Sequence, residues 1–139
     1  MIYNNYSYVL VFTILSCFFA GFGAVCRFAL TKGISSIIKS KVPVATLSIN
    51  CFASFVLGVA FNVFSVFYSI YFSNFVFVMF VGFLGGFSTF STAIFEGVDL
   101  IQNKKIKDGV FLLSYELIMP FAAASIGYFF SMFVLINIV

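Results

Sequence analysis

The chain has 139 residues, of which 63% are hydrophobic and 8% are charged, and its mean hydropathy is +1.21. This composition excludes a soluble domain and indicates an integral membrane protein. The chain has no histidine, which removes the commonest general base and metal ligand, and its three cysteines lack metal-ligand or redox spacing. We therefore expect a protein that is not an enzyme.

Four stretches are long and apolar enough to cross a membrane, since a spanning helix needs about 20 such residues. We expect one all-α transmembrane domain over residues 1–139, with helices at roughly 8–30, 42–64, 75–101 and 109–136. Residues 1–7 carry no basic segment and no cleavage motif follows them, so a cleaved signal peptide is not expected.

The first span ends in the sequence GFGAVCRF, which places Arg27 near one membrane surface. A single arginine there can extend to the lipid headgroups or attract anions into a vestibule, and the sequence leaves both readings open.

The second span carries small and polar residues at every fourth position: Thr46, Asn50, Ser54, Gly58 and Asn62. Thr46, Asn50 and Ser54 lie within roughly 80° on one helix face, because four residues advance about 40° beyond a turn. Such a stripe should face protein or water. It serves either as contact between helices or as an ion path, in which the Asn50 amide offers two donors to an anion.

The third span contains GFLGGFSTFSTAIFE at 82–96, where two glycines and four hydroxyl residues disfavour a continuous helix. Broken backbone survives at membrane depth only where protein or a water-filled cavity satisfies it. We therefore expect this helix to be broken in mid-membrane at an ion or solute site. Phe90 is flanked by Ser88, Thr89, Ser91 and Thr92, and its ring edge can contact an anion favourably.

Acidic residues are few in the spans. Glu96 and Asp99 lie at the end of the third span, and we expect Asp99 to face solvent. Glu116 lies one to two turns into the fourth span, where it either hydrates at the interface or pairs with Arg27 or a lysine.

The lysines predict the orientation. They follow the first span (Lys32, Lys39, Lys41) or the third (Lys104, Lys105, Lys107), and we place all six in loops on one face. The opposite face has none. The positive-inside rule puts both loops in the cytoplasm and both termini outside the cell. A lipid-binding basic patch is the weaker reading of these lysines.

Three patterns in chain order resemble the small fluoride-channel family known as Fluc or CrcB: GFGAVCRF at 21–28, PVATLSINCFASFVLG at 43–58 and GFLGGFSTFSTAIFE at 82–96. The resemblance implies a fluoride-specific channel in the plasma membrane, built as an antiparallel dimer with two pores. It also implies a structural Na⁺ at the dimer centre, held by backbone carbonyls of Gly85 and Ser88. The pore residues implied are Asn50, Thr46 and Phe90, beside the hydroxyls of Ser91 and Thr92. Arg27 matches the vestibule arginine and Glu96 an acidic residue of the same helix.

Departures from the family pattern include Ser88 for a threonine, Ala45 and Ala53 for glycines, and Ala93 for the second pore phenylalanine. The six-to-none lysine bias is unexpected for a chain that inserts in both orientations. We therefore expect a heterodimer with an oppositely oriented homologue rather than a homodimer, with one pore altered by Ala93.

Two rival functions fit the four-span design less well. A small multidrug exporter needs a membrane-central carboxylate on the first span for proton exchange, and that span has none. A non-conducting partner or scaffold subunit is disfavoured by the broken helix and the polar stripe. Passive fluoride export is the function that the sequence predicts.

Overall fold

The computed structural model describes residues 2–38, 43–67 and 74–138, and the side chains of residues 7–38, 43–65 and 76–137. The elements in chain order are the helices α1 (Ile2–Ile37), α2 (Val44–Phe67), α3 (Asn74–Phe87), α4 (Phe90–Gln102) and α5 (Ile106–Ile138). Four segments are long and apolar enough to cross a membrane: Ser7–Ile37, Val44–Ser65, Val76–Gln102 and Ile106–Asn137. The predicted all-α membrane architecture with four spans is confirmed.

The helix bounds differ from the expected ones mainly in α1, which begins and ends several residues further out in each direction. Lys32 therefore lies in the last turns of α1 and Lys107 in the first turn of α5. The prediction that both lie in loops is wrong. Lys104 and Lys105 do lie between α4 and α5, while Lys39 and Lys41 fall outside the described residues.

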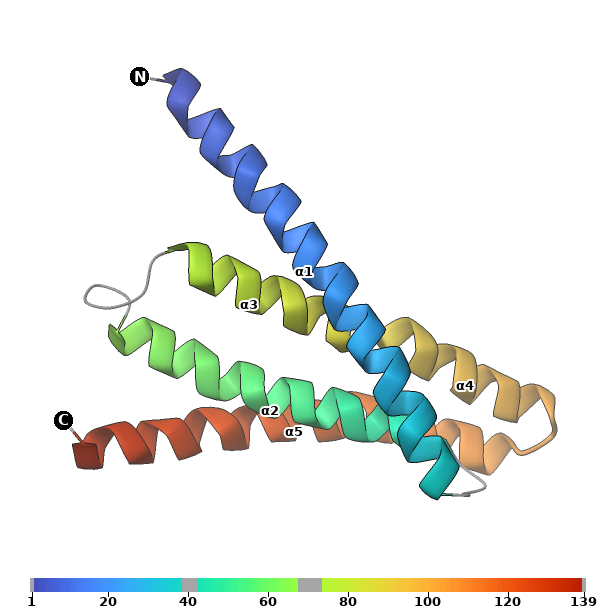
Figure 1. Cartoon of the computed structure of the whole chain (residues 1–139). Helices are drawn as coiled ribbons and strands as arrows, with labels where there is room; N and C mark the ends of the chain where they lie inside the picture. The colour runs from blue at the N-terminus through green and yellow to red at the C-terminus, as the bar shows by residue number, and fades with distance from the viewer. Residues whose placement is uncertain (1, 39–42, 68–73, 139) are drawn as a thin grey trace.

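The helices pair across the sequence rather than along it. α1 packs mainly on α3, and α2 packs mainly on α5, with α4 also lying against α5. Figure 1 shows α2 and α5 running side by side, while α1 crosses α3 and carries the N-terminus away from the bundle.

Glycines allow close contacts between two pairs of helices. A Cβ on Gly86 of α3 would collide with the carbonyl of Ala20 in α1, and a Cβ on Gly58 of α2 would collide with the carbonyl of Ala124 in α5. Backbones approach this closely in membranes because van der Waals packing, rather than exclusion of water, holds the helices together. These glycines thus allow the close approach of α3 to α1 and of α2 to α5.

Candidate functional site

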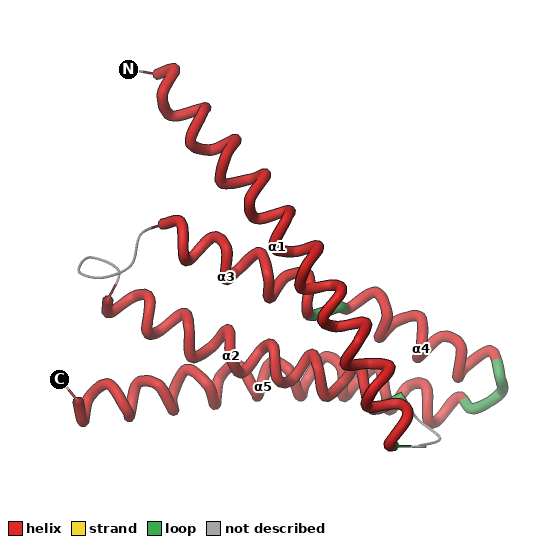
Figure 2. The backbone as a smooth tube through the Cα atoms, in the orientation of Figure 1, coloured by secondary structure: helices red, strands yellow, loops and turns green. Residues whose placement is uncertain are grey.

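The third span is made of two helices, and the residues between α3 and α4 are Ser88 and Thr89 (Figure 2). Thr89 is the N-cap of α4 and has an extended backbone, with φ −155° and ψ 123°. Its hydroxyl accepts a hydrogen bond from the Thr92 N–H at 3.4 Å. Threonine suits this position because its side-chain oxygen replaces a carbonyl that the first turn of a helix lacks.

Asn50 of α2 holds this interruption from the side. The Thr89 N–H donates to Asn50 Oδ1 at 2.8 Å, and Asn50 Nδ2 donates to the Thr89 carbonyl at 2.8 Å. One side-chain amide therefore satisfies both backbone groups of a residue that stands outside any helix. A buried backbone N–H or carbonyl left unpaired costs free energy. These two hydrogen bonds therefore stabilise the interruption inside the subunit.

The same bonds direct backbone donors away from two carbonyls. In a continuous helix the Thr89 N–H would donate to the Gly85 carbonyl and the Thr92 N–H to the Ser88 carbonyl. Here the first N–H donates to Asn50 and the second to the Thr89 hydroxyl. Gly85 is exposed on the subunit surface, and Ser88 is half-buried. Both carbonyls thus lack the N–H partner of a continuous helix, and a backbone carbonyl is a suitable ligand for a hard cation.

Asn50 also contacts α5, a contact that the spacing of the stripe did not predict. Its Nδ2 donates to Glu116 Oε2 at 2.9 Å, and the two side chains are 6% and 3% exposed. The amide that was expected to offer two free donors to an anion thus has both in use. The expectation that Glu116 hydrates at the interface or pairs with a basic residue is wrong, because it is buried against Asn50.

A second carboxyl group lies beside the first on the neighbouring helix. Thr46 Oγ1 donates to Glu96 Oε1 at 2.8 Å. The other oxygens, Glu96 Oε2 and Glu116 Oε1, are buried and have no hydrogen-bond partner. Within the described segments, neither carboxyl group forms an ion pair with a lysine or arginine. Two residues of the polar stripe of α2, Thr46 and Asn50, therefore donate hydrogen bonds to acidic side chains.

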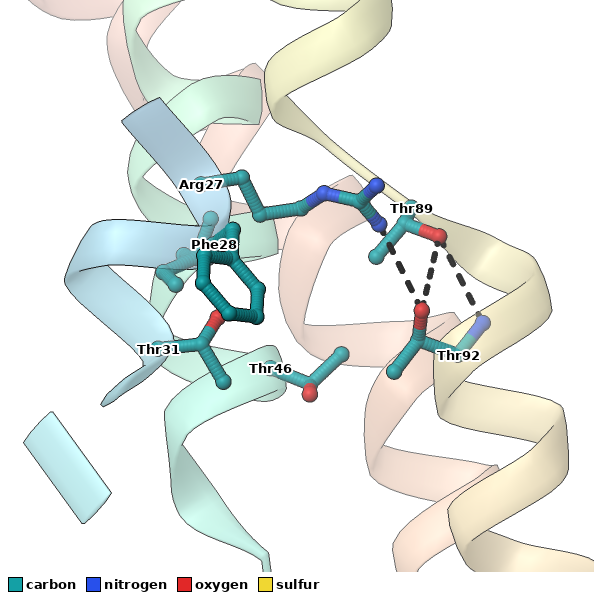
Figure 3. Close-up of a pocket in the computed structure, with 7 residues that line it drawn as sticks. Arg27, Phe28, Thr31, Thr46, Thr89 and Thr92 are labelled. Carbon is teal, nitrogen blue, oxygen red and sulfur yellow. Dashed lines mark hydrogen bonds between the residues drawn. The ribbon is translucent and has the colours of Figure 1, made fainter. Parts of the chain in front are cut away.

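Arg27 of α1 lies in a cavity of about 180 Å³ (Figure 3). The cavity is lined by Arg27, Phe28, Thr31, Thr46, Ile49, Thr89 and Thr92. Arg27 Nη1 donates to Thr92 Oγ1 at 3.4 Å, and the hydroxyls of Thr92 and Thr89 are 3.2 Å apart. The Arg27 guanidinium and the hydroxyls of Thr31, Thr89 and Thr92 line this cavity at the start of α4. They make it suited to a small anion, because helix N-termini also favour negative charge.

Residues 14–128 match the family model described as CrcB-like protein, Camphor Resistance (CrcB). The chain belongs to the CrcB family. A search of curated proteins found no match to the chain.

The CrcB match includes every residue of the site, from Arg27 in α1 to Glu116 in α5. It supports the resemblance drawn from the three sequence patterns. Together with the four apolar spans, it makes the chain a multi-pass membrane protein of a membrane channel family.

The remaining CrcB pattern residues of α4 lie on different sides of the helix. Phe90 is 55% exposed and Ser91 is also exposed, so both face away from the subunit's own core. Ala93 is fully buried, with 0% of its surface exposed. The alanine that we expected to replace a pore phenylalanine is thus packed inside this subunit.

Two contributors to the site were missed by sequence reasoning. Thr89 was noted only as one of four hydroxyl residues, although its position directly before the apolar-polar run of α4 is typical of an N-cap. Glu116 was noted without its true partner. Its separation of 66 residues from Asn50 leaves no local pattern from which the contact could be predicted.

Proposed function

We propose that this chain is a subunit of a fluoride channel that lowers cytoplasmic fluoride by passive export. The observation that carries the proposal is the interruption between α3 and α4, which the hydrogen bonds of Asn50 hold in place. The cavity that Arg27 lines lies beside this interruption. Membership of the CrcB family and the three matching patterns support it.

The direction of transport follows from acid–base partitioning. Hydrogen fluoride crosses bilayers unaided and ionises in a near-neutral cytoplasm, which traps fluoride inside. A membrane potential provides about 2.3 kcal/mol per charge per 100 mV, so a passive path suffices to move the anion out. The proposal therefore requires no nucleotide site and no proton exchange.

Selectivity for a small, strongly hydrated anion requires donors that replace its water shell along a narrow path. The Arg27 guanidinium and the hydroxyls of Thr89 and Thr92 provide such donors at the cavity. The exposed ring of Phe90 and the hydroxyl of Ser91 stand at the surface where a second subunit would complete the path. We place Asn50 and Thr46 beside this path.

We also propose that a structural Na⁺ binds between two antiparallel subunits, on the carbonyls of Gly85 and Ser88. The exposed position of Gly85 and the redirected N–H groups of Thr89 and Thr92 support this assignment. Bound there, the cation would supply positive charge at the dimer centre. We propose an oppositely oriented homologue as the second subunit, because of the lysine bias, and the plasma membrane as the location, with both termini outside the cell.

The experiment that tests the channel function is fluoride efflux from liposomes containing this chain together with its co-expressed homologue. Under an imposed potential, fluoride should leave the vesicles while chloride is largely retained. Equal chloride and fluoride fluxes, or proton-coupled transport of an organic cation, would overturn the proposal.

A further inference from the structure

The hydrogen bonds of the Asn50 amide leave no donor free for a passing anion. Its orientation is fixed because the Thr89 N–H donates to Oδ1, which puts both amide hydrogens on the other side. One hydrogen is donated to the Thr89 carbonyl at 2.8 Å and the other to Glu116 Oε2 at 2.9 Å. An amide NH₂ has two hydrogens, and both are used.

The Glu116 carboxyl group depends on this contact. The side chain is 3% exposed, and its Oε1 is buried without a hydrogen-bond partner. Across the described ranges, the bond from Asn50 is the one hydrogen bond that its carboxyl oxygens receive, and no basic side chain pairs with them. A carboxyl oxygen and a fluoride ion are both strong acceptors, so they compete for the same N–H group.

We propose that Glu116 is a built-in ligand of the Asn50 amide, which it occupies in place of fluoride, so that the ion path beside this Asn50 has low affinity for the anion. This inference rests on the function proposed above and adds a specificity-determining residue to it. A fluoride ion that uses Asn50 must displace Oε2 and, whenever Glu116 is ionised, also approach a like charge in a poorly solvated site.

A second observation agrees with a restricted path in this subunit. Ala93 lies on the same short helix as Glu96 and is 0% exposed. Because its side chain has no aromatic ring, it offers no ring edge to an ion path. Both features remove anion contacts from the path of this chain.

The test compares three variants of the full chain in lipid nanodiscs. Glu116→Met removes the acceptor and leaves one Asn50 hydrogen free. Glu116→Gln removes the charge but keeps an oxygen that accepts the same bond. Asp108→Asn removes an exposed carboxylate from the same helix and serves as the matched control.

Thermal unfolding is then followed in KF and in KCl at equal ionic strength. We expect Glu116→Met to gain fluoride-specific stabilisation, with an apparent fluoride affinity roughly tenfold or more above that of the unmodified chain, because a buried unpaired donor gains a charge-assisted bond. Glu116→Gln and Asp108→Asn should stay within about twofold of the unmodified chain. An unchanged fluoride response in Glu116→Met would overturn the inference.

A measurement on the unmodified chain keeps the inference testable if Glu116→Met does not fold. The side-chain amide resonances of Asn50, assigned through their loss in Asn50→Ser, should be unaffected by KF. A fluoride-dependent shift of these resonances would show that the donor is available and would overturn the inference. Neither measurement depends on conduction, so failure of the channel function appears separately, as absent fluoride efflux from liposomes that contain both subunits.

Discussion

Asn50 and Thr89 are 39 residues apart in the sequence, and the side chain of the first forms hydrogen bonds with both the N–H and the carbonyl of the second, each at 2.8 Å. A residue whose N–H and carbonyl are both paired in this way does not need hydrogen bonds from a helix. The interruption of the third span therefore depends on a residue of the second span. Changes at position 50 should affect the geometry of the interruption as well as any anion that passes.

The first prediction concerns Asn50→Asp. The substitution removes the donors to the Thr89 carbonyl and to Glu116, and it puts negative charge beside the proposed path. Repulsion of an anion about 4 Å away amounts to roughly 4 kcal/mol at an effective dielectric constant of 20, enough to stop useful flux. Fluoride efflux from liposomes measures the effect.

Asn62→Asp is the matched control for burying a charge in α2. Asn62 is also 6% exposed, but its partner is Ser131, at 3.1 Å, in the half of α2 remote from the interruption. This variant should be less stable yet still conduct when folded. Normal efflux through folded Asn50→Asp would place Asn50 away from the path.

The second prediction concerns Na⁺. Replacing Na⁺ with a larger monovalent cation should lower fluoride efflux or dissociate the dimer, because the carbonyls of Gly85 and Ser88 would lose their cation. Ser88→Ala should have little effect, since the proposed ligand is a backbone atom. Full efflux and unchanged dimerisation after exhaustive removal of Na⁺ would rule out this cation site.

The third prediction concerns Ala93→Phe, which restores the residue that the family pattern has at this position. Ala93 is fully buried, so the ring would overpack the core and destabilise the fold by about 1–3 kcal/mol. Ile94→Phe, at a neighbouring position that is 41% exposed, should be tolerated. Thermal unfolding compares the two, and equal stability would mean that the packing around Ala93 has room for a ring.

The fourth prediction concerns topology and assembly. With lysines on one face, the chain should adopt one orientation, with Lys104 in the cytoplasm and both termini outside. Expressed alone it should fail to protect fluoride-sensitive cells, and a homologue of opposite bias should restore protection. Comparable C-terminal reporter activity on both sides of the membrane, with rescue by the single chain, would instead show a dual-topology homodimer.

The fifth prediction concerns the contact between α2 and α5. Gly58→Ala should destabilise the fold, because the new Cβ would collide with the Ala124 carbonyl. Gly21→Ala is the control, since no atom lies within 4 Å of the Cβ that it would add. If both variants unfold at the same temperature, the close approach of these helices contributes nothing measurable.

Sequence reasoning predicted the four spans and predicted that Thr46 and Asn50 face protein or water rather than lipid, because length, hydropathy and four-residue spacing are local properties. In the structure both side chains are buried. Sequence reasoning also indicated an interrupted third span, but the glycines are not where the helix ends. Gly85 and Gly86 lie within α3, and the interruption falls after them, at Ser88 and Thr89. Gly86 instead allows contact with α1.

The contacts across the bundle could not be predicted in the same way. The stripe on α2 shows which side chains share a face, but it carries no information about which helix lies opposite. The pairing of Asn50 with Glu116, and of Thr46 with Glu96, follows only from the arrangement of α2 against α4 and α5. A single sequence contains no local trace of contacts between residues so far apart.

The pairing of helices across the sequence has a consequence for biogenesis. A membrane protein is inserted from its N-terminus, so α1 enters the bilayer before α3, its main packing partner, has been synthesised. The second span likewise precedes α5, against which its glycine and polar residues pack. Asn50 and Thr46 therefore enter the lipid before their acceptors on α4 and α5 exist. We expect the early chain to need shielding by the insertion machinery until the last helix is released.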